Sequence, residues 1–334
     1  AVASLVGLYP VPGKGVIDGS RRKKIVGINA LAQRFTAWGT IYTGIAAKDY
    51  MDGTGNFYGV HSVTLYVDSV QVFRSVTDEV SPNENRMING FTDYEELMKN
   101  RRLIMRSHKL PGNKLRLLHT DENRGLVTID EERDYRFMYV LEDNFGNRKK
   151  YRFTVRGRKQ EIPEQKQDSC KTLYWNRTNV IQEPGMEFVI PRGMLYDDAP
   201  LRTAVVGDSS NLSFEYTLDA RHTPLHGFCQ LAIGIRNDTL ADKSKYYIRN
   251  RVGKWTSSVG GKYDNGWMKA DIRQWGNFSV AVDTIAPNVT PIGQNLWRTR
   301  RDIRFRVSDG QTGIASYKVL IDGKFVLFAL KKGV

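Results

Sequence analysis

One stretch of this sequence occurs twice, and the repeat constrains the fold more than any other feature. Residues 59–73, GVHSVTLYVDSVQVF, return 254 positions later as residues 313–327, GIASYKVLIDGKFVL. Each copy reads as a strand, a tight turn at Asp-Ser or Asp-Gly, and a second strand, which is the signature of a β-hairpin. Two copies so far apart predict two β modules of one kind, separated by a different unit.

The two copies differ in how much sequence follows them. The first copy continues to about residue 156, whereas the second is followed only by residues 328–334. We therefore expect the last module to be incomplete and the chain to be a fragment of a longer, multi-module protein.

Turn residues and linkers divide the rest of the chain. Short runs rich in Val, Ile and Tyr alternate with Gly- and Asn-containing turns, which predicts an all-β fold of tandem Ig-like β-sandwich modules, the last one truncated. A capping box that begins at Thr92 predicts one short helix. The predicted divisions are a lead-in at 1–23, an Ig-like module with a short helical insertion at 24–156, a β-sandwich module at 168–283 and an incomplete Ig-like module at 292–334.

The charge of the chain indicates its class of partner. The formal net charge is +14, and basic residues alternate with apolar ones in segments such as 152–156 and 304–307. Alternation with a period of two places the charges on the solvent-facing side of strands. This pattern favours a cell-wall or other anionic envelope polymer over nucleic acid, because no nucleic-acid recognition motif accompanies it. The sequence contains no run of 18 apolar residues, so it predicts no transmembrane helix.

Residues that could carry catalysis form no known pattern. His119 and Asp121 could clip a metal from a loop, but a solvated turn explains them as well. His222 and His226 have a spacing found in helical zinc sites, yet Pro224 between them argues against a helix. We therefore predict no catalytic residue, no metal site and no cofactor in this chain, and no stoichiometric zinc. The sequence leaves open whether the parent protein is an enzyme.

The two cysteines allow two interpretations. Cys170 and Cys229 are 59 residues apart, a separation compatible with a disulfide between the two sheets of a sandwich. Two buried thiols that pack as small apolar side chains are the alternative.

Aromatic residues supply the candidate ligand-binding site. Four of them crowd into 21 residues beside Gly260, Gly261 and Gly266. Rings on glycine-rich loops can form a stacking platform for sugars or bases, although packing in a sandwich core explains them equally well. The four candidates are Trp255, Tyr263, Trp267 and Trp275.

Several stretches of the chain, in order, carry a resemblance to a known family. They are GLYPVPGKGVIDG (7–19), GVHSVTLYVDSVQVF (59–73), FTDYEE (91–96), PGNKLRLL (111–118), IDEERDYRFMYVLEDNFGN (129–147), IPRGMLYDD (190–198), DKSKYYI (242–248), GGKYDNGW (260–267) and TGIASYKVLIDGKFVLF (312–328). Together they resemble the accessory β-sandwich region downstream of the catalytic domain in secreted lysostaphin-type zinc metallopeptidases of Gram-negative bacteria, which cut peptidoglycan.

The resemblance implies a role but no catalytic residue. The zinc ligands of that family lie in a His-x3-Asp motif and a His-x-His motif. None of the five histidines in this chain is followed by Asp four positions later or by His two positions later. The resemblance therefore implies that this chain is a non-catalytic part of a longer, zinc-peptidase-like parent protein. The upstream catalytic domain of that parent would be a further partner.

Two hypotheses about function follow from the sequence. The first is a non-catalytic cell-envelope region of a peptidoglycan metalloendopeptidase-like protein, which positions or binds rather than cuts. The alternative is an adhesin or carbohydrate-binding surface protein that uses the aromatic loops. Both predict a secreted, periplasmic or outer-surface protein. The identity of the ligand and the oligomeric state cannot be read from the sequence.

Overall fold

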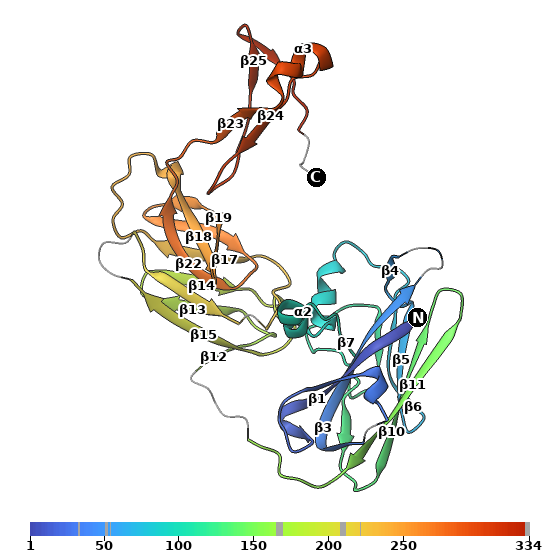
Figure 1. Cartoon of the computed structure of the whole chain (residues 1–334). Coiled ribbons are helices and arrows are strands. Elements are labelled where there is room, and N and C mark those ends of the chain that lie inside the picture. The colour runs from blue at the N-terminus through green and yellow to red at the C-terminus, as the bar shows by residue number, and fades with distance from the viewer. Residues whose placement is uncertain are drawn as a thin grey trace.

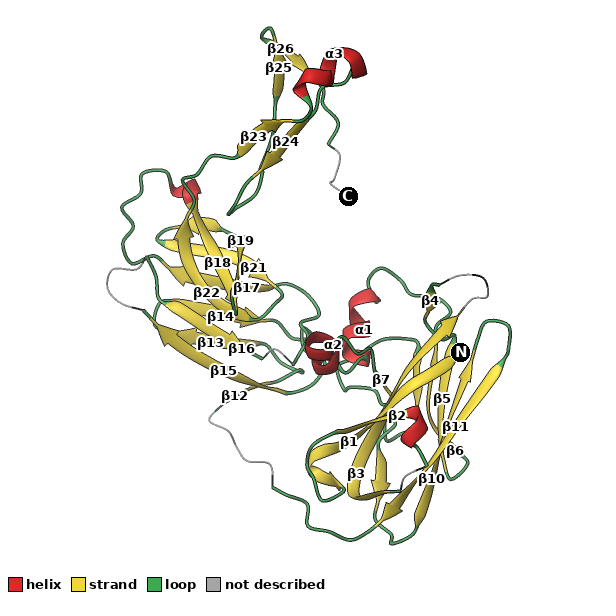
Figure 2. Cartoon of the chain, viewed as in Figure 1, coloured by secondary structure: helices red, strands yellow, loops and turns green. Residues whose placement is uncertain are grey.

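Strands are the main regular structure of the chain and helices are few and short, as the sequence predicts (Figure 2). The computed structural model describes residues 1–32, 34–50, 53, 55–164, 170–207, 212–220 and 222–330. The longest helix in this part spans only Tyr94–Asn100. Among the described residues, none of the helices is both long and apolar enough to cross a membrane. The all-β class is therefore confirmed.

The first module is one continuous sheet that surrounds its own core. Strand β3 pairs with β1 on one side and with β7, β9 and the end of β11 on the other, so it joins the layers of the module. The sheet continues in the order β11-β10-β5-β6-β8. Its strands are β1 (Val2–Ile17), β2 (Lys24–Gly27), β3 (Phe35–Tyr50), β4 (Phe57–Tyr58), β5 (Ser62–Val67), β6 (Val70–Val76), β7 (Met105–Arg106), β8 (Leu118–Thr120), β9 (Val127–Ile129), β10 (Asp134–Glu142) and β11 (Arg148–Gly157), with a 3-10 turn η1 (Ile28–Ala30).

Residues 1–23 are part of this module rather than a lead-in to it. Strand β1 pairs with β3 from Val2 to Ile17, across a bulge between Pro10 and Gly15. Val6 and Leu8 on β1 are fully buried in the first core. The predicted boundary at residue 24 is therefore wrong, because the apolar side chains of β1 complete the core that the later strands leave open.

The repeated segments both form hairpins, as predicted. In the first copy the turn between β5 and β6 lies at Asp68 and Ser69, whose φ angles are 49° and 72°. In the second copy the turn lies at Asp322 and Gly323, with φ angles of 50° and 78°. Positive φ at both central residues is the type I′ geometry that matches the twist of the flanking strands.

The helical insertion of the first module is capped differently from the prediction. It contains η2 (Asn85–Met87), α1 (Ile88–Phe91) and α2 (Tyr94–Asn100). Asp93 is the N-cap of α2, and its carboxylate accepts a hydrogen bond from the backbone N–H of Glu96 at 3.3 Å. Thr92 instead ends α1, where its hydroxyl donates to the carbonyl oxygen of Ile88. The cap is displaced by one residue because a second short helix occupies Thr92.

The second module is a sandwich of two sheets with a core between them. One sheet has the order β12-β15-β16-β22-β18-β19 and the other β13-β14-β17-β21-β20. Residues from both sheets, including Phe188, Leu231 and Phe278, form a single buried cluster. The strands are β12 (Lys171–Leu173), β13 (Asn179–Glu183), β14 (Met186–Ile190), β15 (Ala199–Val206), β16 (Glu215–Asp219), β17 (Cys229–Gly234), β18 (Tyr246–Val252), β19 (Trp255–Gly260), β20 (Lys262–Asp264), β21 (Trp267–Ile272) and β22 (Gly276–Val282), with η3 (Lys243–Lys245).

The cysteines of this module form no disulfide with each other. Both are free thiols; Cys229 is buried and Cys170 half-buried. Burial, and to a smaller extent the carboxylate of Asp271, raise the pKa of the Cys229 thiol to about 12. The disulfide that the sequence left open is therefore not formed, and Cys229 packs as a small apolar side chain.

The last part of the chain lacks a buried core. None of the described residues from 284 to 330 is buried, and Figure 1 shows this part standing apart from the two larger modules. Its anchor to the second module is polar: Thr312 donates to Asp283 at 2.6 Å and Tyr247 to Gln311 at 3.2 Å. Its elements are β23 (Asn288–Pro291), η4 (Gln294–Leu296), α3 (Trp297–Arg300), β24 (Phe305–Ser308), β25 (Val319–Ile321) and β26 (Lys324–Val326).

The first two modules dock through the helical insertion (Figure 1). Tyr196 of the second module lies within hydrogen-bonding distance of two groups. Its hydroxyl donates to the carbonyl oxygen of Arg86 at 2.8 Å and lies 2.9 Å from Nδ1 of His226. The Arg86 guanidinium crosses the same boundary and donates to the carbonyl oxygens of His226 and Leu225. We call this contact the Tyr196 lock.

Candidate functional site

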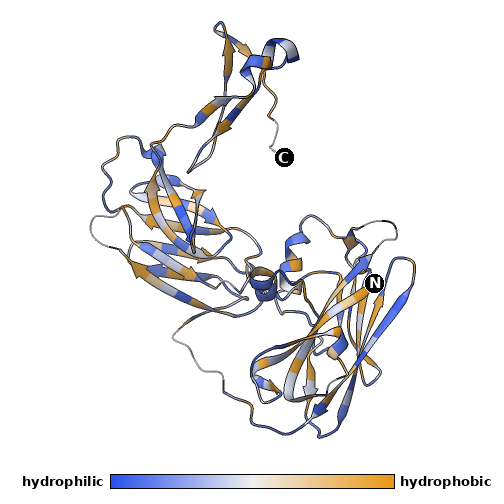
Figure 3. Cartoon of the chain, in the orientation of Figure 1, coloured by the Kyte–Doolittle hydropathy of each residue, from blue (hydrophilic) through white to orange (hydrophobic). Residues whose placement is uncertain are grey.

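The outward-facing side chains of β5, β6, β10 and β11 form the candidate site. Strand β10 alternates strictly, because Tyr135, Phe137, Tyr139 and Leu141 are buried in the core while the residues between them face outward. Figure 3 shows the corresponding alternation of hydrophobic and hydrophilic residues along the strands. The sequence pattern of period two therefore places the basic residues of this hairpin outside the core.

Strand register brings the outward residues into rows. Met138 of β10 is opposite both Tyr66 of β5 and Arg152 of β11. In the next row, Val140 lies opposite Thr64 and Lys150, and Thr64 lies opposite Arg74 of β6. Directly opposite residues on neighbouring antiparallel strands lie about 5 Å apart on the same face of a sheet. We call this surface the basic face; its cationic members are Arg34, Arg74, Arg136, Arg148, Lys150 and Arg152.

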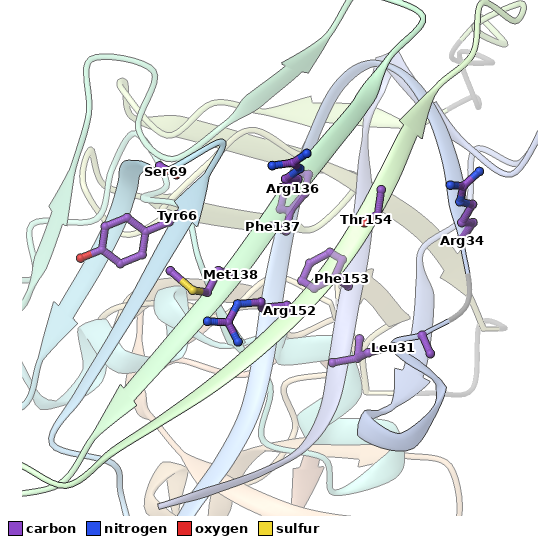
Figure 4. A pocket seen from close by; sticks show the side chains of 11 residues that line it. Leu31, Arg34, Tyr66, Ser69, Arg136, Phe137, Met138, Arg152, Phe153 and Thr154 are labelled. Atoms are coloured by element: carbon purple, nitrogen blue, oxygen red, sulfur yellow. The ribbon is translucent and has the colours of Figure 1, made fainter.

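Two adjoining hollows mark the basic face. The first has a volume of about 440 Å³ and is lined by Arg34, Arg136 and Arg152 around Tyr66 and Met138. Figure 4 shows Tyr66, Met138, Arg136 and Arg152 on neighbouring strands of the sheet and Arg34 beside them. The second hollow, of about 230 Å³, shares Tyr66 and Met138 with the first. Its cationic lining residues are Arg74, Arg148 and Lys150.

The centre of the basic face keeps its positive charge. Glu142 neutralises Arg148 at 3.0 Å, and Asp134 lies 3.5 Å from Arg34. Within the part of the chain that the structure describes, four cations on this face have no ion-pair partner. These four are Arg74, Arg136, Lys150 and Arg152. The edges of the face are therefore neutralised, while the cations around Tyr66 and Met138 remain available to an anionic ligand.

The turn beside the first hollow is fixed by one carboxylate. Asp68 accepts a hydrogen bond from the backbone N–H of Arg136 at 2.9 Å and another from the Arg133 guanidinium at 2.6 Å. Burial opposes ionisation of Asp68, but these two donors outweigh it and lower its pKa. An ionised Asp68 thus ties the β5–β6 turn to β10 and holds Ser69, which lines the first hollow, in place.

The arrangement is suited to contact with an anionic ligand. Cations around an aromatic and a thioether side chain can hold a chain that carries both negative charge and apolar or sugar surface. Among the described residues, no group of three or more His, Cys, Asp or Glu side chains could hold a metal ion.

The histidines singled out in the sequence lie in three different environments. His119 is exposed on β8 opposite Arg74, at the margin of the basic face, while the Asp121 carboxylate accepts the backbone N–H of Gly125. His226 belongs to the Tyr196 lock. His222 is half-exposed, with Nδ1 3.9 Å from Glu95. The structure does not bring these histidines into one site.

The four aromatic candidates are not brought together as one platform. Trp275 is buried; its ring packs edge-on against Phe188 and its Nε1–H donates to the carbonyl oxygen of Thr223. Tyr263 stacks on Tyr246 and donates its hydroxyl hydrogen to Asp238 at 2.6 Å.

The two remaining candidates are accessible. Trp267 is 37% exposed at the start of β21, and Trp255 is 84% exposed at the start of β19 in the other sheet. Core packing therefore accounts for Trp275, whereas Trp255 and Trp267 are the two aromatics of this group open to a ligand.

Comparison with protein families gives a match within the second module. Residues 170–283 match the family of the Zu5-like domain, a range that coincides with the two-sheet sandwich described above. No curated protein matches the chain. The match says nothing about peptidoglycan peptidases, so that relationship stays a prediction.

Sequence reasoning missed the basic face as a site. The alternating charges on residues 148–156 were visible, and they pointed to a solvent-facing strand. Their convergence with Arg74 and Tyr66 depends on the register of β5 and β6 against β10, which joins residues about 70 positions apart. The signal that could have found it is the combination of three outward cations on one strand with the nearby hairpin repeat.

Proposed function

We propose that this chain is a non-catalytic region that holds a protein of the cell envelope on an anionic polymer of the wall. The observation that carries the proposal is the group of four cations around Tyr66 and Met138 that have no ion-pair partner among the described residues. The resemblance to accessory regions of lysostaphin-type peptidases supports a setting in which such a region positions a peptidoglycan-cutting domain. The proposal places the protein in the periplasm, outside the cell or on its outer surface.

The geometry favours an extended anionic chain as ligand. Residues two apart on a strand lie about 7 Å apart on one face, so Arg148, Lys150 and Arg152 present cations at regular spacing along β11. Arg74 and Arg136 widen this row across the sheet. A polymer with repeating phosphate or carboxylate groups can contact several of these cations at once. Its attachment should weaken with salt, because exposed charges are screened beyond about 10 Å at 0.1 M ionic strength.

Co-sedimentation with purified cell-wall sacculi over a salt series tests the proposal. The variant carries Arg136→Gln and Arg152→Gln, which remove two central charges from exposed positions without disturbing the core. The matched control carries Arg192→Gln and Lys262→Gln, which remove the same charge from exposed positions of the second module. We expect the first variant to lose most of its binding at low salt and the control to retain it. Equal loss in both would show that net charge alone, and not the basic face, holds the polymer.

Exposure of Trp255 favours a second candidate function, an adhesin or carbohydrate-binding surface protein. A ring that is 84% exposed can stack on the apolar face of a sugar. This function predicts binding to neutral glycans that survives high salt. The binding would be lost with Trp255→Ala or Trp267→Ala and kept when Arg136 and Arg152 are replaced.

A further inference from the structure

The turn between β10 and β11 presents a phenylalanine to solvent on a rigid support. Phe145 is 92% exposed. The Asp143 carboxylate accepts the backbone N–H groups of Phe145 and Asn147, each at 2.9 Å, and also the side-chain amide of Asn147. Gly146 takes the positive φ that closes this turn. The turn is therefore organised in advance around a large apolar side chain that contributes nothing to the core.

A second group of exposed aromatic residues lies at the end of β3 and on β4. Tyr50, Phe57 and Tyr58 are each more than half exposed. The two strands pair through Tyr50 and Phe57. The Lys48 ammonium lies over the Phe57 ring, 3.5 Å from its centroid. This group thus combines apolar rings with a cation.

Both aromatic groups lie at the same end of the first module (Figure 1). The amino group of Ala1 forms an ion pair with Asp49 at 3.0 Å, beside Tyr50. The pKa of Asp143 is lowered mainly by its hydrogen bond from Asn147, and the charge of the same amino group adds to the effect. The N-terminus therefore lies at this same end of the module. The backbone N–H of Ala3 also donates to the Tyr151 hydroxyl at 3.0 Å, which joins β1 to β11 near this end.

The charges at this end complement an anionic surface. Lys48 and Lys149 are exposed beside the aromatic residues. Among the residues that the structure describes here, the acidic groups are engaged: Asp143 within its turn, Glu142 with Arg148 and Asp49 with Ala1. Apolar rings on projecting turns with cations behind them match the layers of a bilayer surface, where rings enter the acyl boundary and ammonium groups contact phosphates.

We propose that this end of the first module, which we call the aromatic tip (Tyr50, Phe57, Tyr58 and Phe145 with Lys48 and Lys149), docks on an anionic lipid bilayer. The docking would be independent of polymer binding at the basic face, because it rests on the exposed rings and not on the hollows of the sheet. It would hold the basic face at a fixed distance from a membrane. Phe57 lies on β4 and Phe145 in the β10–β11 turn, so each should contribute separately to binding.

Vesicle co-sedimentation tests the aromatic tip. Vesicles of phosphatidylcholine alone are compared with vesicles that also contain phosphatidylglycerol. We expect the whole chain to bind the anionic vesicles. Phe145→Ser and Phe57→Ser should each weaken binding about tenfold, the effect of partly burying one phenylalanine ring. Trp255→Ser is the matched control, because it removes a comparably exposed ring from the second module, and it should change binding less than about twofold. Phe145 contributes no core contact, so its replacement should leave the fold intact.

A second readout measures insertion directly. In Phe145→Trp, the added tryptophan emission should shift to the blue with anionic vesicles and be quenched by brominated lipid, relative to the wild-type spectrum. The proposal is wrong if the chain does not sediment with anionic vesicles, or if Phe145→Ser binds like the wild type. It is also wrong if Trp255→Ser loses as much binding as Phe145→Ser.

Discussion

The Tyr196 lock should set the relative position of the first two modules, and replacing its hydroxyl tests this. Tyr196 is 2% exposed. Its hydroxyl donates to the carbonyl oxygen of Arg86, and Nδ1–H of a neutral His226 can donate to the same hydroxyl oxygen. Tyr196→Phe keeps the ring and removes both hydrogen bonds. It leaves the carbonyl oxygen and the imidazole nitrogen without their partner in a buried contact.

The expected loss of docking free energy between the two modules is large enough to measure. A buried polar group that loses its partner costs about 1–3 kcal/mol. A change of this size lowers the equilibrium constant for docking by a factor of about 5 to 150. We therefore expect Tyr196→Phe to populate undocked molecules.

Small-angle scattering supplies the assay. Undocking should raise the radius of gyration and speed cleavage of the helical insertion by protease. Tyr216→Phe is the control, since the Tyr216 hydroxyl donates to the carbonyl oxygen of Pro184 at 2.7 Å within the second module. It should lower the stability of that module without changing the scattering.

Gly90→Ala perturbs the Tyr196 lock from the first module, because Gly90 lies in α1 of the helical insertion. A Cβ at Gly90 would lie 2.8 Å from Cγ of Tyr196. Alanine favours a helix over glycine by about 1 kcal/mol, but overpacking a fixed ring costs about 1–3 kcal/mol. We expect the clash to outweigh the propensity. Unchanged scattering in both Gly90→Ala and Tyr196→Phe would refute the reasoning.

Three further predictions concern the remaining parts of the chain. Gly276→Ala should lower the free energy of unfolding of the second module by about 1–3 kcal/mol in urea titration. The added Cβ would lie 2.0 Å from Oδ1 of a buried asparagine. Gly27→Ala is the control and should have little effect, because the space around its Cβ is open. Burial, reinforced by neighbouring arginines, lowers the pKa values of His108 and His226. The unfolded chain therefore binds more protons than the folded chain, and stability should fall as pH drops below about 6.5. The urea midpoint measured over pH checks this, and His108→Gln should make the midpoint less dependent on pH. Limited proteolysis should cut first between residues 284 and 299, and protection of that joint together with everything after it would show that the last strands pack on the second module.

Local patterns predicted the parts of the fold that local interactions decide. The hairpins at residues 59–73 and 313–327 formed as expected, because an Asp-Ser or Asp-Gly pair fixes both the turn and the register. The β10–β11 hairpin followed from strict alternation. These features need no information from distant residues.

Features that depend on distant partners were missed or misjudged. Residues 1–23 were predicted to be a lead-in, yet β3 supplies a partner for β1 that tolerates a bulge between Pro10 and Gly15. The crowding of Trp267 and Trp275 in sequence suggested a platform, but the two rings have different environments because Trp267 begins β21 and Trp275 follows the end of that strand. The basic face required a register between β5 and β10 that no local pattern specifies.

The Tyr196 lock also has a mechanical consequence. Residues 158–170 connect the first two modules in sequence, so the modules are joined both by chain and by contact. Thirteen residues can span at most about 45 Å when extended. Tension on the protein would load the Tyr196 lock, and its opening would let the two modules separate within the reach of their connection while both cores stayed folded. The pair of modules would then act as a reversible extensible tether, with a yield force set by a few hydrogen bonds.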